Sequence, residues 1–255
     1  MHCTFLGHST LLVQSGDSAL LTDPLLTDRI LIKKRCLPAG IAPENLPPLD
    51  AITISHAHAD HLHLPSLKRL PRTARLIVPA GVGRFVEKLG FAAVVELAWW
   101  DSTTVGDFTV TAIPVNHVRG RFFPWQDTGV NSYVIADGKN AFFVAGDIDF
   151  GPSPELAQLA DRFLLSAAAL PVGGMREVAY YTRRRGKKGV HIDPRTAWDL
   201  FLQTGARVLV PIHWGAVRMA RTPISEPVDT VLEIARAFQM ASRVRPLAPG
   251  EGCEL

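Results

Sequence analysis

Apolar residues along this chain fall into short runs separated by polar, glycine and proline residues, and the spacing within the runs alternates between strand-like and helix-like. Residues 4–22 are predicted to form strands separated by a turn at Ser15-Gly16-Asp17. Residues 130–145 are predicted to form a hairpin, because Asp137-Gly138 is a tight-turn pair. Further strands are predicted at 50–55, 76–78, 94–95, 103–105, 108–114 and 208–210.

Helical spacing appears between these strands. Helices are predicted from residue 64 onward, and at 82–89, 153–163, 193–205 and 228–240, with a passage from helix to strand at 164–171. Asp193-Pro194 is typical of a helix start, and Gly90 of a helix end. The proline-rich segment before residue 50 is predicted to be a loop. No linker or low-complexity segment divides the chain, so one α/β domain is predicted over residues 1–255.

Composition narrows the class of protein. An apolar content of 47% and a charged content of 20% are typical of a globular protein with an ample core. The formal net charge of +3 is too small to indicate a nucleic-acid partner. A basic run at 183–188 is interpreted either as a solvated loop or as an attraction for an anionic substrate or membrane surface.

Cysteine usage and hydropathy favour a cytoplasmic location. The 3 cysteines are widely separated and contain no Cys-x-x-Cys pair, which argues against a disulfide framework and fits a reducing compartment. Strand-like sequence begins at Cys3, which leaves no room for a signal peptide. No apolar stretch approaches the ~20 residues that span a bilayer, so no transmembrane segment is predicted.

The segment Ser55–His61 carries the main candidate chemistry. His56, His58, Asp60 and His61 follow a β-branched apolar run directly. Residues two apart in extended chain point to the same side, so His56 and His58 can bind one ion together, and the following turn can direct Asp60 and His61 to a second. The alternative is a chance cluster of polar residues on a solvated loop. Imidazole and carboxylate favour zinc or a similar divalent metal.

Three more candidate ligands share one feature: His117, Asp147 and His213 each lie just past an apolar strand. Active sites on sheet-based folds concentrate at strand ends.

A bound divalent ion lowers the pKa of water from ~15.7 to ~7, so hydrolysis at such a site needs no serine or cysteine nucleophile. The segment beginning Gly7-His8-Ser9 lacks the Gly-x-Ser-x-Gly pattern of a nucleophile elbow.

The pattern His-x-His-x-Asp-His, followed by His117, Gly146-Asp147 and His213, resembles the metallo-β-lactamase superfamily. Within it, the chain is similar to the group of N-acylphosphatidylethanolamine-hydrolysing phospholipase D and L-ascorbate-6-phosphate lactonase. The shared segments are Gly7-His8-Ser9-Thr10, Thr22-Asp23-Pro24, Leu97-Ala98-Trp99-Trp100, His191-Ile192-Asp193-Pro194 and Ile212-His213-Trp214-Gly215. One departure is Gly146-Asp147-Ile148-Asp149, where relatives commonly have Gly-Asp-Thr-Gly.

The resemblance implies a four-layer αββα sandwich with a site for two divalent metal ions, zinc above all, with manganese or iron as alternatives. It assigns His56, His58 and His117 to the first ion, Asp60, His61 and His213 to the second, and Asp147 to both. The implied reaction is attack of metal-bound hydroxide on a phosphodiester, such as an N-acylphosphatidylethanolamine-like phospholipid. Alternatives are a lactonase or sugar-phosphate ester hydrolase, an iron redox enzyme and a metal-binding protein without turnover.

Residues around the ligands have further candidate roles. Asp60 and His191 are the candidate catalytic residues, with His191 facing the reacting group. Arg119, Arg121 and Phe123 are candidate substrate contacts, because guanidinium pairs with two phosphate oxygens and the aromatic segment can meet an acyl chain. His8 and Asp23 are candidates for positions beneath the metals, where Asp23 would orient a ligand histidine. His63 is predicted on a helix surface.

The expected partner is a small-molecule or lipid substrate, with peripheral membrane contact and a homo-oligomer both left open.

Overall fold

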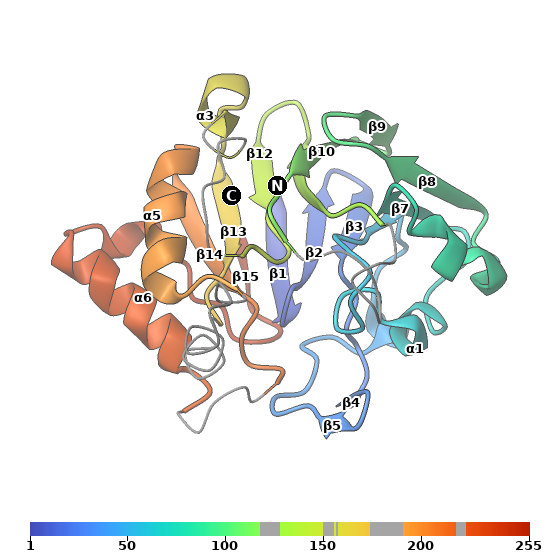
Figure 1. Cartoon of the computed structure of the whole chain (residues 1–255), viewed down its shortest axis with the longest axis horizontal. Helices are drawn as coiled ribbons and strands as arrows, with labels where there is room; N and C mark the ends of the chain where they lie inside the picture. Colours follow the sequence, from blue (N-terminus) through green and yellow to red (C-terminus); the bar gives the residue numbers. More distant parts are fainter. Residues whose placement is uncertain (118–127, 150–155, 157, 174–190, 218–222) are drawn as a thin grey trace.

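The computed structural model describes residues 1–117, 128–149, 156, 158–173, 191–217 and 223–255. Within them, two large mixed sheets stack face to face, and helical segments lie outside each sheet (Figure 1). The predicted sandwich of the metallo-β-lactamase type is therefore confirmed. No helix of the described ranges is both long and apolar enough to cross a membrane.

The first sheet has the order β15-β1-β2-β3-β6-β7-β8. Its strands are β1 (His2–Gly7), β2 (Thr10–Ser15), β3 (Ser18–Thr22), β6 (Ala51–Thr53), β7 (Arg75–Pro79), β8 (Ala93–Leu97) and β15 (Gly252–Glu254). Strands β15, β1, β2 and β3 pair antiparallel, and β3, β6, β7 and β8 pair parallel. A separate two-stranded hairpin joins β4 (Arg29–Ile30) to β5 (Lys33–Lys34).

The second sheet has the order β14-β13-β12-β11-β10-β9. Its strands are β9 (Ser102–Val105), β10 (Phe108–Pro114), β11 (Asn131–Ala136), β12 (Ala141–Val144), β13 (Ala167–Pro171) and β14 (Val208–Ile212). Strands β9 to β12 pair antiparallel, and β12, β13 and β14 pair parallel. The predicted hairpin at 130–145 is confirmed, and Asp137 accepts hydrogen bonds from two backbone N–H groups of its turn.

Side chains alternate between the two faces of each strand, so one strand contributes to two apolar cores. Between the sheets, Phe5 and Leu11 of the first pack with Tyr133 and Phe142 of the second. The residues next to them in sequence point the other way. Leu12, for example, belongs to the core outside the first sheet. The continuous apolar runs of these strands therefore reflect burial on both faces.

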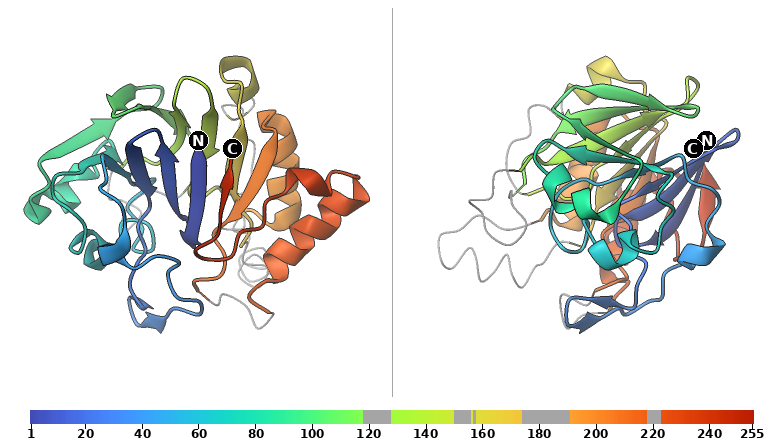
Figure 2. Two further views of the ribbon diagram at one scale, coloured as in Figure 1. Left: turned by 180° about the vertical axis from the view of Figure 1, so that it is seen from behind. Right: turned by 90° about the vertical axis from the view of Figure 1, so that its right-hand side faces the viewer.

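Helical segments cover the two outer faces (Figure 2). Outside the first sheet lie α1 (Leu64–Leu67) and the short 3₁₀ segments η1 (Pro43–Asn45), η2 (Gly83–Phe85) and η3 (Glu87–Leu89). Outside the second lie α3 (Leu159–Arg162), α5 (Pro194–Thr204), α6 (Glu226–Ala237) and η4 (Ala241–Arg243). Helix α5 begins and ends as predicted, since Asp193 accepts a hydrogen bond from Thr196 N and Gly205 has a φ of +68°.

Several predicted elements differ in the structure. The helix at 82–89 is wrong: Gly83 and the β-branched Val82 and Val86 favour two short 3₁₀ segments over a continuous helix. The loop before residue 50 contains the β4–β5 hairpin, which was not predicted. His63 is buried rather than on a helix surface, with Nδ1 2.8 Å from Ser66 Oγ. Most of the helix predicted at 153–163 lies outside the described residues.

Candidate metal centre

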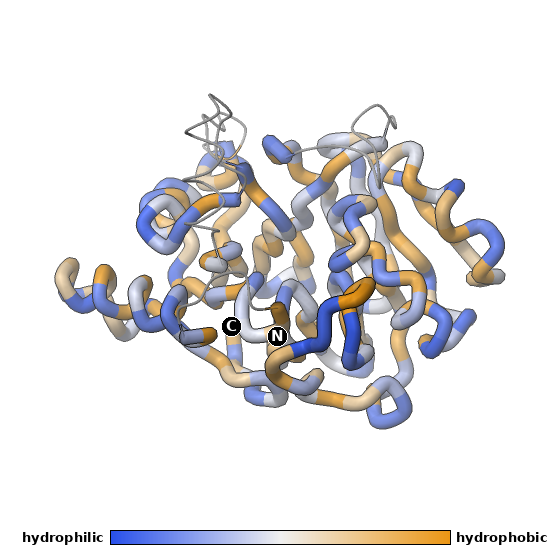
Figure 3. The backbone as a smooth tube through the Cα atoms, turned by 60° about the horizontal axis from the view of Figure 1, so that its bottom comes forward, coloured by the Kyte–Doolittle hydropathy of each residue, from blue (hydrophilic) through white to orange (hydrophobic). Residues whose placement is uncertain are grey.

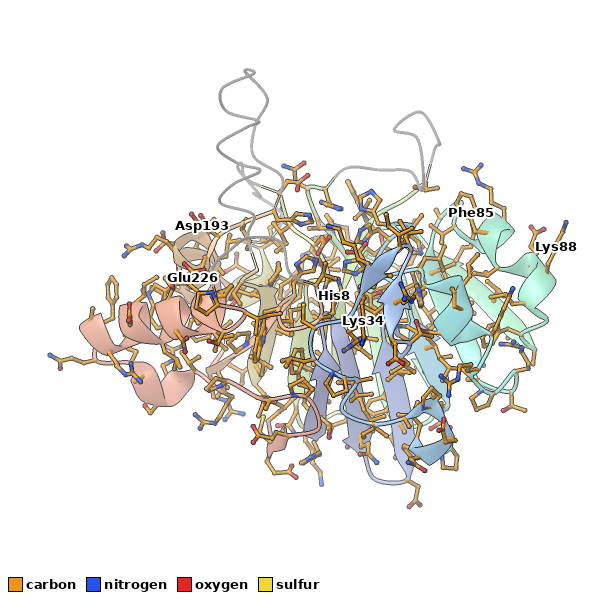
Figure 4. All side chains as sticks on the ribbon, turned by 90° about the horizontal axis from the view of Figure 1, so that it is seen from below. His8, Lys34, Phe85, Lys88, Asp193 and Glu226 are labelled. Atoms are coloured by element: carbon orange, nitrogen blue, oxygen red, sulfur yellow. The ribbon has the colours of Figure 1, made fainter. Side chains whose placement is uncertain are left out.

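One edge of the sandwich gathers the candidate site residues. Strands β1, β3 and β6 run in the same direction, as do β10, β12 and β14, so the ends of each set lie at one edge of their sheet. The segments that leave these ends carry His8, Asp23, the 56–61 cluster, His117, Asp147 and His213. Figure 4 looks onto this edge and shows His8 near its centre.

Backbone hydrogen bonds join the two sheets at this edge. His213 N donates to His8 O at 2.7 Å, and His8 N donates to Trp214 O at 3.2 Å. Asn131 N donates to Ser55 O at 2.9 Å, and the Tyr133 hydroxyl donates to Ile54 O at 2.8 Å. Segments from both sheets are therefore held in fixed register beside the candidate ligands.

A first group of side chains contains His56, His58, His117 and Asp147. His58 Nδ1 lies 2.8 Å from His56 Nε2 and 3.2 Å from His117 Nε2. Asp147 Oδ2 lies 3.6 Å from both His56 Nε2 and His117 Nε2. Three ring nitrogens and a carboxylate oxygen thus face one point, which is the donor set that a divalent cation takes.

A second group contains His8, Asp60, His61 and His213. Asp60 Oδ2 lies 3.1 Å from His8 Nε2, and 3.9 Å from both His61 Nε2 and His213 Nε2. The side chain of Asp60 is 32% exposed, whereas that of His61 is fully buried. The carboxylate of Asp60 is therefore the donor of this group that solvent and a substrate can reach.

Asp147 lies between the two groups. Its Oδ2 is 3.2 Å from His61 Nε2 and 3.4 Å from His191 Nδ1, and its Oδ1 is 3.0 Å from His213 Nε2. Yet the three ring nitrogens and Asp147 Oδ1 are all buried, and within the part of the chain that the structure describes none of them has a hydrogen-bond partner of good geometry. Buried polar atoms are rarely left so, and several converging on one carboxylate fit the ligands of a cation.

Asp23 and Ser55 fix the orientation of two of these rings. Asp23 Oδ2 lies 2.7 Å from His61 Nδ1 and accepts a 2.6 Å hydrogen bond from Ser55 Oγ. Ser55 Oγ lies 3.0 Å from His56 Nδ1. Because the Nδ1 atoms are engaged on the far side, both rings turn Nε2 toward Asp147. Carboxylate partners of this kind set the tautomer and raise the basicity of ligand histidines.

The third such partner, Asp149, was missed by the sequence prediction. Its Oδ1 lies 3.0 Å from His117 Nδ1 and accepts a 3.0 Å hydrogen bond from His191 N. Burial would raise the pKa of Asp149, but the contact with His117 lowers it below its ordinary value. The departure from the Gly-Asp-Thr-Gly pattern was the signal, because it places a carboxylate two residues after Asp147.

His191 lies beside the candidate ligands, and the N-cap of α5 is Asp193 rather than His191. Its side chain is 11% exposed, and its ring lies 5.0 Å from that of His213 and 5.4 Å from that of His117, centre to centre. Nδ1 is directed at Asp147, and no hydrogen bond joins Nε2 to another residue of the described ranges. Asp147, His191 and His213 also form a compact donor group of their own, so distance alone permits His191 to act as a ligand.

Left-handed backbone conformations are concentrated at the site. Among the described residues other than glycine, 7 have a positive φ, and they include His8 (+59°), Asp23 (+35°), His191 (+65°) and His213 (+62°). Such conformations cost on the order of 1–3 kcal/mol and persist where the surrounding structure imposes them. Gly146 also has a positive φ, and a Cβ there would lie 2.6 Å from Ser55 Cβ.

Burial keeps several of the imidazoles neutral. It lowers the pKa of His58 to about 4 and the pKa values of His56 and His213 well below that of ordinary imidazole. A neutral imidazole offers a lone pair to a metal ion. These three rings are therefore in the protonation state that ligation requires.

For Asp147 and His61, nearby opposite charges outweigh the effect of burial on the pKa. Burial would raise the pKa of Asp147, but the imidazoles of His213 and His61 lower it well below that of an ordinary carboxyl. Burial would lower the pKa of His61, but the carboxylates of Asp147, Asp23 and Asp60 raise it well above that of imidazole. A divalent cation bound in place of the proton on His61 would supply the positive charge that these carboxylates attract.

Some candidate residues cannot be placed. Arg119, Arg121 and Phe123, with the rest of their segment, and the basic run at 183–188 lie outside the described residues. A cavity of about 490 Å³ does open beside the ligand segment, and its lining includes Ala59, His63 and the hairpin residues Arg29 and Leu31.

Comparisons with known proteins agree with this architecture. The family model described as the beta-lactamase superfamily domain matches residues 19–214. A protein of Mycobacterium tuberculosis described as uncharacterized is 32% identical over 261 residues, which cover 97% of this chain and 67% of that protein. An N-acyl-phosphatidylethanolamine-hydrolyzing phospholipase D of Caenorhabditis elegans is 29% identical over 257 residues, covering 93% of this chain and 70% of the enzyme.

Among solved structures, a possible metal-dependent hydrolase from Veillonella parvula superposes with a TM-score of 0.81 at 13% identity, covering 100% of this chain and 99% of its own. At that identity the likeness concerns the fold alone. The assignment to a family rests instead on the family model and on the sequence relatives that align with nearly the whole chain. The chain belongs to the metallo-β-lactamase superfamily and is a metal-dependent hydrolase of that family.

Proposed function

We propose that the protein is a two-metal phosphodiesterase whose preferred substrate class is the headgroup diester of a phospholipid. The observation that carries the proposal is the pair of four-residue donor groups that meet at Asp147. Imidazole and carboxylate donors favour zinc, and metal analysis would separate zinc from manganese or iron. In hydrolytic sites, two bound divalent ions supply an activated water and neutralise charge on the substrate oxygens.

In this proposal, His56, His58 and His117 would hold the first ion, Asp60, His61 and His213 would hold the second, and Asp147 would be a ligand shared by the two groups. The grouping of the described side chains supports this division. His8 is then a positioning residue, because its Nε2 lies 3.1 Å from Asp60 Oδ2 and fixes the direction of that carboxylate. Asp23 contacts Nδ1 of His61, and Asp149 contacts Nδ1 of His117, so each carboxylate orients one imidazole ring.

Two residues would handle protons. Asp60 is the partly exposed carboxylate of the centre and can accept a proton from a water molecule that attacks phosphorus. His191 presents Nε2 beside the centre and can donate a proton to the leaving alkoxide, or a hydrogen bond to a phosphoryl oxygen.

The lipid part of the proposal draws on a relative. The Caenorhabditis elegans protein is named for hydrolysis of N-acyl-phosphatidylethanolamine, and it aligns with 93% of this chain. We also propose that residues 1–255 act as one domain, because β15 pairs with β1 and both sheets supply donors to one centre.

The test is product analysis by mass spectrometry after metal-loaded protein is incubated with an N-acylphosphatidylethanolamine. Phosphatidic acid formed by the native chain and absent with His61→Ala is the expected result. Hydrolysis of a lactone or a sugar-phosphate ester in a parallel panel, without cleavage of the phosphodiester, would contradict the proposed substrate class.

Substitution of His191 tests whether this residue is a ligand or a proton donor. His191→Ala is expected to lower turnover by about 10²-fold while metal content stays at the native level. The measurement pairs inductively coupled plasma mass spectrometry with steady-state rates. Loss of one ion from the variant would make His191 a ligand and overturn its proposed role.

A further inference from the structure

The β4–β5 hairpin carries an apolar tip that the protein leaves uncovered. Its two turn residues are Leu31, which is 72% exposed, and Ile32, which is 89% exposed. Arg29, Lys33 and Lys34, which flank them, are also exposed. Figure 3 shows the result along the chain: a hydrophobic stretch at the tip bounded by hydrophilic residues.

Leucine at position 31 of the turn is unfavourable for two reasons, its backbone conformation and its exposed apolar side chain. Leu31 has a φ of +51°, the left-handed region that glycine, asparagine and aspartate tolerate best. A polar residue of that kind would relax the backbone and remove exposed apolar surface at once. Leucine at this position therefore indicates a use for the side chain outside the folded chain.

The base of the hairpin is fixed, so the exposure of its tip is built into the fold. Ile30 is buried in a small cluster with Leu25 and Ala216. The buried guanidinium of Arg35 donates to the carbonyl oxygens of Leu6, Leu25 and Leu37. These contacts hold the hairpin at the end of β1, beside His8.

The hairpin also lies on the side where a substrate must enter. In Figure 1 it projects from the edge at which the ligand-bearing strands end. The lining of the cavity of about 490 Å³ includes Arg29 and Leu31 of the hairpin and Ala59, which is next to the proposed ligand Asp60 in sequence. A lipid held at the tip would therefore lie next to an opening that reaches the ligand segment.

We propose that the β4–β5 hairpin docks the protein on an anionic lipid surface, with Leu31 and Ile32 inserted among the acyl chains and the three basic side chains at the headgroups. This inference rests on the proposed lipid phosphodiesterase function. Two apolar side chains are too little to form a stable protein interface, which takes about 800 Å² from each partner. Apolar insertion combined with basic side chains is the form of contact that an anionic membrane surface provides.

The test is co-sedimentation of the metal-loaded protein with vesicles of phosphatidylcholine and phosphatidylglycerol. Leu31→Asn is the most informative variant, because asparagine accepts the positive φ and removes the apolar side chain. Leu31→Asn combined with Ile32→Ser is expected to lower vesicle binding at least about tenfold without lowering the melting temperature. Lys33→Glu with Lys34→Glu is expected to lower it similarly, and pure phosphatidylcholine vesicles are expected to bind native protein weakly.

Leu164→Ser is the matched control, because Leu164 is 92% exposed and follows α3 at the opposite edge (Figure 1). It is expected to leave binding unchanged. Native-level binding by the tip variants, or equal loss in the control, would overturn the proposal. So would a change of oligomeric state in the tip variants on sedimentation velocity, because the tip would then join copies of the chain.

A soluble diester separates this inference from the proposed function. The tip variants are expected to hydrolyse bis(p-nitrophenyl) phosphate at the native rate and to lose activity only toward vesicle-borne substrate. If native protein binds vesicles but cleaves no phosphodiester, the proposed function fails and the docking surface stands. If it cleaves the soluble diester but does not bind vesicles, the docking surface fails alone.

Discussion

Asp147→Asn is expected to abolish two-metal binding and to reduce turnover by roughly 10³-fold or more. The carboxylate of Asp147 faces four imidazoles through Oδ2 and His213 through Oδ1, at 3.0–3.6 Å. An amide offers one oxygen, and its NH₂ group cannot act as a ligand, so the variant cannot contact two ions. The shape of the side chain is preserved, which keeps the effect on packing small.

The measurement is metal content by plasma mass spectrometry alongside hydrolysis of bis(p-nitrophenyl) phosphate. Asp199→Asn, on the exposed face of α5, is the matched control and is expected to behave as the native protein. Retention of two ions by Asp147→Asn with a rate within threefold of native would show that the carboxylate does not join the ions.

His61→Ala and His213→Ala are expected to lose most turnover, by more than about 100-fold, while the chain stays folded. Losses of 10–100-fold are typical of residues that only orient a ligand, so direct donors should exceed them. Each variant removes a donor of the second group and leaves His56, His58 and His117 intact. The metal content is therefore expected to fall from two ions to one.

Circular dichroism and metal analysis check both variants, with His2→Ala as the control. His2 lies in β1, where its ring contacts Glu254, and takes no part in either donor group. Near-native rates in either His61→Ala or His213→Ala would show that hydrolysis does not need the second ion.

Local sequence patterns predicted many of the elements, and the reason is visible in the packing. Strands such as β10 and β12 are bounded by turn residues and rich in apolar side chains because both faces are buried. Helix α5 could be predicted because its N-cap residue, Asp193, and its C-cap residue, Gly205, are both typical of helix ends. The helix predicted at 82–89 failed because Gly83, the flanking glycines at 81 and 90, and the carboxylate of Glu96, which accepts a hydrogen bond from Gly83 N, favour short turns.

The candidate ligands could be proposed because each directly follows a strand. His8 and Asp23 could be named as supporting candidates, but the residues they contact could not be predicted, and Asp149 was missed. The contacts of Asp23 with His61, of Asp149 with His117 and of His8 with Asp60 join residues 32–52 positions apart in the sequence. No local spacing records such pairs. The β4–β5 hairpin was missed because its strands are two residues each and its turn lacks glycine and asparagine.

The pairing of β1 with β15 has a consequence for how the molecule can be handled. Met1 and Leu255 lie side by side, joined by a 3.0 Å hydrogen bond from Leu255 N to Met1 O (Figures 1 and 2). Both start from the side of the sandwich away from the strand ends that bear histidines. Polypeptide fused at either end, or a tether to a solid support, would therefore leave the reactive edge and its hairpin pointing outward, and the two ends could be joined by a short linker.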